Sequence, residues 1–111
     1  MSERIKKLND LIRDEVGKIL MTEVEAENNT LITVTGADVS PTLEHATIKI
    51  SVFPSDKTDE ILKKLKKQIY QIQQLLNKRL NMRPVPKIRF ELDKTEEKAE
   101  KIEKLIEKVV K

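Results

Sequence analysis

Apolar residues follow two different spacings along the chain. Three segments have apolar residues every three or four positions, the spacing of an amphipathic helix. These helical segments span residues 2–23, 58–81 and 95–109. Three shorter segments are rich in β-branched residues or alternate apolar with polar positions, as half-buried strands do. These strand segments span residues 31–39, 46–52 and 88–92. The pattern predicts the order helix, strand, strand, helix, strand, helix.

Proline and glycine refine these boundaries. Ser40-Pro41-Thr42 fits a turn between the first two strands, because proline presets the first central turn position, and Pro54 should end the second strand. Gly36 lies inside the first strand pattern and predicts a bulge or a close backbone approach. The prolines at 84 and 86 lack amide donors, so the long helix must end before them.

The helix predicted over residues 58–81 is long for a small domain. Drawn straight it would reach about 36 Å, whereas a chain of this length has a radius of gyration near 13 Å. We therefore expect a bend, in the polar stretch from Gln68 to Gln74. The last predicted helix has Thr95 as its N-cap and acidic residues in its first turn.

These elements predict an α+β fold with helices on one face of a three-stranded sheet. The chain has 111 residues, of which 38% are hydrophobic, enough for one modest core, so we expect a single domain over residues 1–111. It has no cysteine, and we find no signal peptide and no apolar run that could span a bilayer. We expect a soluble intracellular protein, a monomer that does not bind membranes.

The charge is unevenly distributed along the chain. The full sequence has 22 basic and 19 acidic residues, yet the segment from Ile61 to Phe90 has nine basic residues and no acidic one. Subtracting those nine leaves 13 basic against 19 acidic residues in the other 81, a net charge of −6. Such segregation is typical of a polyanion-binding surface. The residues that we predict to bind RNA are Lys63, Lys64, Lys67, Lys78, Arg79, Arg83, Lys87 and Arg89.

Two prolines lie in the middle of this basic segment. We interpret Pro84 and Pro86 as a rigid joint that holds Arg83 and the first residues of the third strand in fixed relation to the end of the long helix. Such rigidity reduces the ordering cost of binding phosphates.

The sequence offers little catalytic chemistry. His45 is the only histidine, with no nucleophile beside it and no His or Cys companion for a metal ion. Phosphate-cradling glycine motifs are missing. We expect no enzyme activity, no metal, no cofactor and no small-molecule substrate. Phe53 and Phe90 are expected to pack in the core, and the role of Tyr70 stays open.

Two longer stretches carry a family resemblance. The run VTGADVSPTLEHATIKISVF, residues 34–53, resembles the strand-turn-strand signature of ribosome-binding factor A, and LNKRLNMRPVPKIRFELD, residues 76–93, resembles that family's helix end, basic turn and third strand. The resemblance implies a type II KH-like fold. It also implies an assembly factor that binds the immature 30S ribosomal subunit and its 16S rRNA and assists late maturation, including 5′-end processing. The setting that it implies is the bacterial cytoplasm or an organelle, with importance in the cold, and we expect the cytoplasm. The chain has Gln68-Ile69-Tyr70 where the family usually has Ala-x-Gly.

A different class of function also fits the residues. The lysines of the long helix could be a solvated face of a small protein-interaction module that docks a partner through its first or last helix. Nuclease treatment and charge reversal would distinguish the two, because only RNA binding depends on both.

Overall fold

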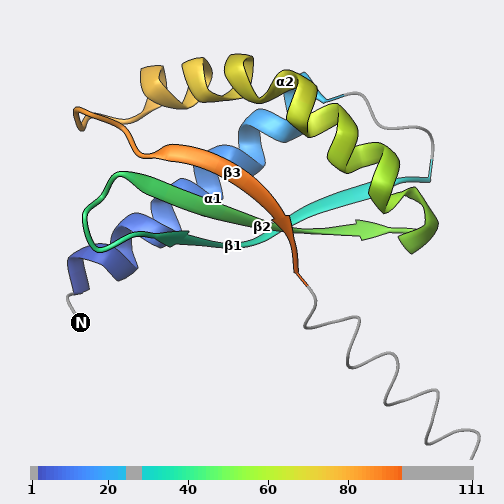
Figure 1. Cartoon of the computed structure of the whole chain (residues 1–111), viewed down its shortest axis with the longest axis horizontal. Helices are drawn as coiled ribbons and strands as arrows, with labels where there is room; N and C mark the ends of the chain where they lie inside the picture. The colour runs from blue at the N-terminus through green and yellow to red at the C-terminus, as the bar shows by residue number, and fades with distance from the viewer. Residues whose placement is uncertain (1–2, 25–28, 94–111) are drawn as a thin grey trace, which may run out of the picture.

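The computed structural model describes residues 3–24 and 29–93 (Figure 1). The elements are α1 (Glu3–Glu23), β1 (Leu31–Val39), β2 (His45–Phe53), the short 3-10 helix η1 (Ser55–Lys57), α2 (Thr58–Arg79) and β3 (Lys87–Leu92). The predicted α+β class and the order of elements through β3 are confirmed. The helix predicted from Thr95 lies outside the described residues.

The three strands form one mixed sheet in the order β1-β2-β3. β1 pairs antiparallel with β2, and β3 pairs parallel with β2 at the edge of the sheet. The register of β1 shifts between Val34, which lies opposite Ile50, and Gly36, which lies opposite Lys49. This irregularity confirms the predicted bulge at Gly36. The extra residue, Thr35, donates its hydroxyl hydrogen to a carboxylate oxygen of Asp93, 2.6 Å away.

Both helices pack on the same face of the sheet. The even-numbered residues of β2, from Ala46 to Val52, are buried, whereas the odd-numbered ones face the opposite, open side of the sheet. The helices supply the rest of the core. Their buried residues are Ile12, Val16, Ile19 and Leu20 on α1 and Ile61, Leu65, Ile72 and Leu76 on α2. The predicted arrangement of helices on one face is therefore confirmed.

Helix α2 changes direction near its middle, as Figure 1 shows. Every residue from Thr58 to Arg79 nevertheless remains α-helical. The expected bend is thus present without a break in the helix. The side-chain oxygen of Gln68 is buried and has no hydrogen-bond partner, so this part of α2 contains an unsatisfied polar atom.

One expectation about the core is wrong. Phe53 was expected to pack, yet it is 68% exposed, because odd-numbered positions of β2 face the open side of the sheet. Leu31, directly across the strand pair, is 62% exposed. Phe90 lies on the side of β3 that faces the helices and is partly buried against the core, as expected. None of the described helices has the length and apolar character needed to cross a membrane.

Candidate nucleic-acid interface

The exposed side of α2 carries a group of lysines without partners. We call this surface the outer face of α2 and define it by Lys63, Lys66, Lys67, Tyr70 and Lys78, all of which are exposed. None of its four lysines forms a hydrogen bond or an ion pair in the described part of the chain. Their positive charges are therefore available to a ligand.

For three of the four lysines the lack of partners follows from the local sequence, whereas Lys63 follows Asp59 and Glu60 closely and still forms no ion pair with them. The acidic residues of α2, Asp59 and Glu60, lie in its first turn, where the helix dipole favours negative charge. Residues three or four positions apart are neighbours on a helix surface, and no acid lies within four positions of Lys66, Lys67 or Lys78. The segregation of charge in the sequence thus becomes a positive surface in the fold.

Arg79 is placed differently from its neighbour Lys78. Its guanidinium Nη1 lies 2.9 Å from carboxylate oxygen Oε2 of Glu15 on α1. The other oxygen of that carboxylate, Oε1, lies 3.6 Å from the ammonium group of Lys18. Only 17% of the Glu15 side chain is exposed. Arg79 therefore links the two helices, and part of its charge is neutralised within the protein.

The joint between α2 and β3 is held by a glutamine as well as by proline. The side-chain amide of Gln73 donates a hydrogen bond to the carbonyl of Pro86 over 3.1 Å, and its oxygen accepts one from the amide of Ile88 over 2.9 Å. Pro86 is fully buried, whereas Pro84 is exposed. The rigid joint was expected from the two prolines, but Gln73 was missed, since nothing in the sequence distinguishes it from Gln71 or Gln74.

Arg83 lies at this joint and folds back onto it. Its guanidinium Nη1 donates to the carbonyls of Leu80, over 3.0 Å, and Met82, over 2.6 Å. Both carbonyls lie just beyond the end of α2, in the loop that leads to β3, so Arg83 satisfies backbone acceptors of that loop. The side chain stays exposed, so its charge remains accessible to solvent.

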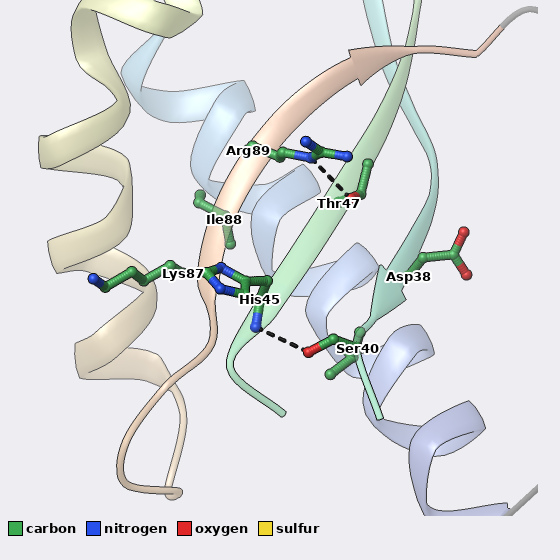
Figure 2. A pocket seen from close by; sticks show the side chains of 8 residues that line it. Asp38, Ser40, His45, Thr47, Lys87, Ile88 and Arg89 are labelled. Carbon is green, nitrogen blue, oxygen red and sulfur yellow. Dashed lines mark hydrogen bonds between the residues drawn. The ribbon is translucent and has the colours of Figure 1, made fainter. Parts of the chain in front are cut away.

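Lys87 and Arg89 lie on the open face of the sheet. Figure 2 shows Arg89 extending from β3 to Thr47 on the neighbouring strand β2, to which its Nε donates over 3.2 Å. A second guanidinium nitrogen of Arg89 lies 3.8 Å from a carboxylate oxygen of Glu91. Lys87 is the register partner of His45, and both line a hollow that also includes Arg89. This end of the sheet is a second, smaller basic surface.

The predicted site residues are therefore divided by the fold. Lys63, Lys67 and Lys78 share the outer face of α2, while Lys64 lies beside it, half-buried. The remaining four occupy other places: Lys87 and Arg89 on the open face of the sheet, Arg83 at the joint and Arg79 against α1. The fold adds Lys66 and Tyr70, which the sequence left outside the site.

The geometry of the outer face of α2 suits the binding of an anion. His45 is held to Ser40 through its backbone, whose amide donates to the hydroxyl of Ser40 over 3.1 Å and whose carbonyl accepts from the amide of Ser40 over 2.8 Å. Within residues 3–24 and 29–93, no three His, Asp or Glu side chains gather closely enough to hold a metal ion. Unpaired ammonium groups on a rigid helix are suited to neutralising phosphates.

Comparisons with known proteins agree with one another. The family model for ribosome-binding factor A matches residues 4–106. Ribosome-binding factor A of Coxiella burnetii is 32% identical over 111 residues, which cover the whole of this chain and 93% of that protein. The protein of the same name from Dehalococcoides mccartyi is 34% identical over 111 residues, covering 98% of this chain and 94% of that one.

Solved structures show the same fold. The crystal structure of ribosome-binding factor A from Thermus thermophilus superposes with a TM-score of 0.67 at 16% sequence identity, covering 79% of this chain and 93% of that one. A homology model of the Thermus thermophilus protein, fitted into a cryo-electron-microscopy map of a complex with 30S, gives a TM-score of 0.65 at 16% identity, covering 77% of this chain and 90% of that one.

Proposed function

The chain belongs to the ribosome-binding factor A family, and we propose that it binds the immature 30S ribosomal subunit through 16S rRNA and assists late maturation, including 5′-end processing. The related Thermus thermophilus protein has been fitted into a map of a 30S complex, which supports this partner. We propose that the chain acts in the cytoplasm, as a monomer, and matters most in the cold. The observation that carries the proposal is the outer face of α2, with its unpaired lysines.

Physical chemistry favours a polyanion over a protein at this surface. Lysine ammonium groups that neutralise phosphates release the counterions condensed on RNA, which makes binding favourable and strongly dependent on salt. Such contacts position a protein on the RNA without reading its sequence. The surface therefore supplies affinity, and rRNA shape or unpaired bases must supply specificity.

Co-sedimentation with immature small subunits tests the proposal. We expect the protein to sediment with the subunits at low salt and to be largely released at moderate salt, because its contacts are with phosphates. Sedimentation of the protein alone is the control for aggregation. If the protein stays in the supernatant with immature subunits at both salt concentrations, the proposed function is wrong.

A second candidate function rests on the exposed apolar pair Leu31 and Phe53. This pair lies on the open face of the sheet, away from the outer face of α2, and favours a protein-interaction module over an RNA-binding one. A partner recovered by pull-down despite nuclease treatment and despite charge reversal at Lys78, Arg79 and Arg83 would support this alternative. Loss of the partner under either treatment would support RNA binding.

A further inference from the structure

The chain has a single tyrosine, and it lies in the middle of the outer face of α2. Tyr70 is 73% exposed, and in the described part of the chain it makes no hydrogen bond or ring contact. Aromatic rings are large apolar groups that usually bury most of their surface. An exposed ring among unpaired lysines therefore contributes little to the stability of the fold.

The neighbours of Tyr70 on the helix surface are unequal. Residues three or four positions away have Cβ atoms about 5 to 6 Å apart. On the N-terminal side these neighbours are Lys66 and Lys67, and on the C-terminal side they are Gln73 and Gln74. The amide of Gln73 is occupied by the backbone around Pro86 and Ile88. Cations therefore lie on one side of the ring and neutral groups on the other.

The direction of the side chain brings the ring towards the lysines. In a helix the Cα–Cβ bonds tilt towards the N-terminus, and long side chains cover the preceding turn. The ring of Tyr70 consequently belongs with Lys66 and Lys67 rather than with the glutamines. An aromatic face beside two free ammonium groups matches the two parts of a nucleotide, its base and its phosphate.

We propose that Tyr70 stacks on an unpaired base of the rRNA while Lys66 and Lys67 contact phosphates of the same strand. The proposal rests on the proposed function and specifies the ligand of the outer face of α2 as single-stranded RNA. Bases within a duplex are stacked on each other and are not available to a protein ring, whereas bases in loops, bulges and ends can be splayed out and stacked. Stacking of this kind tolerates any base, because every base has a π-face.

Tyrosine fluorescence measures this contact directly. The chain has one tyrosine and no tryptophan, so emission excited in the tyrosine band reports on position 70 alone. Titration with single-stranded poly(A) RNA should quench the emission, while an RNA duplex should leave it nearly unchanged even where the duplex binds. Unchanged emission with poly(A) bound would overturn the proposal.

Three variants extend the test to immature 30S subunits. Stacking on an aromatic side chain changes binding by about 1 to 3 kcal/mol per base, which corresponds to roughly 5- to 150-fold in Kd, and Tyr70→Ala should lose that much affinity. Tyr70→Phe keeps the ring and should bind almost as the native protein does. Met21→Ala is the control, because Met21 is a large apolar residue on α1 that is 85% exposed and has no part in either proposed surface.

The outcomes separate this inference from the proposed function. If the native protein binds the subunits and Tyr70→Ala binds as well as Met21→Ala, stacking is wrong and the function stands. If the native protein does not bind the subunits, both are wrong. Because both substituted residues are exposed, thermal unfolding should confirm that each variant remains folded.

Discussion

Two adjacent residues, Lys78 and Arg79, show how the fold divides a run of like charges. They carry the same charge at the end of α2, but Lys78 has no partner in the described part of the chain, whereas Arg79 pairs with Glu15. Lys78 is therefore free to bind a phosphate. Arg79 would have to give up its carboxylate partner first, and Glu15 would then repel the phosphate.

Single alanine substitutions should separate these two roles. We expect Lys78→Ala to weaken binding to immature subunits with almost no change in stability. Arg79→Ala should change binding less and lower the free energy of unfolding by about 0.2 to 1 kcal/mol, the usual contribution of a solvent-screened ion pair. Co-sedimentation and urea unfolding measure the two effects. Equal losses of binding would show that the ion pair with Glu15 opens on the RNA.

At the scale of the elements, the contact between α2 and β3 depends on Gln73. β3 is an edge strand, and the side-chain amide of Gln73 satisfies both the carbonyl of Pro86 and the amide of Ile88 at that edge. An edge strand that lacks such cover exposes unpaired backbone groups. Gln73 therefore fixes the position of β3, and with it Lys87 and Arg89, relative to α2.

Replacing Gln73 by alanine should destabilise the protein measurably. The substitution leaves a donor and an acceptor of the joint without partners, and an unsatisfied polar group costs about 1 to 3 kcal/mol when water cannot reach it. Gln74→Ala, one residue along on the exposed side of the helix, is the matched control and should change stability by less than about 0.5 kcal/mol. Urea unfolding of both variants provides the measurement, and similar values for both would show that Gln73 does not hold the joint.

The spacing of residues along the chain was sufficient to predict the helices and strands. It was not sufficient to predict contacts between residues that are far apart in the chain. The helices, the strands, the bulge at Gly36 and the end of β2 before Pro54 depend on neighbours in the sequence, and each was predicted. The Arg79–Glu15 pair joins residues far apart in the chain, and the sequence gives no signal for it. Phe53 differs because its apolar side chain predicts burial while the alternation of β2 places position 53 on the open face, and in the structure the alternation decides.

The whole molecule has basic surfaces on opposite sides of one core. The outer face of α2 points away from the sheet. Lys87 and Arg89 belong to β3 and lie on the open face of the sheet, which the helices do not cover. The joint around Arg83 connects these surfaces along the chain, at the edge where α2 runs beside β3 (Figure 1). An rRNA segment that passes around this edge could contact both surfaces at once.

Charge reversal at the joint tests whether position matters more than net charge. We predict that Arg83→Glu with Lys87→Glu reduces binding to immature subunits far more than Lys6→Glu with Lys7→Glu, although both pairs change the net charge equally. Lys6 and Lys7 are exposed on α1 and, within the described residues, have no ion-pair partners, so they match the joint residues in accessibility. Lys98→Glu with Lys101→Glu, outside the described residues, gives a second control in a segment where acidic and basic residues alternate.

The dependence of binding on salt distinguishes lost phosphate contacts from a general loss of attraction. Log K falls as log salt rises, and each phosphate contact that is removed should make this slope shallower by about 0.7 to 0.9. The joint pair should therefore make it shallower by roughly 1.4 to 1.8 if both residues bind phosphates. The control pairs remove no contact and should leave the slope nearly unchanged while weakening binding slightly at low salt, because long-range attraction is screened. Co-sedimentation across a salt series, with thermal melts to confirm folding, provides the measurement. Equal losses of affinity and equal slopes for all pairs would mean that net charge alone attracts the protein to the subunit, and the joint would then have no special role.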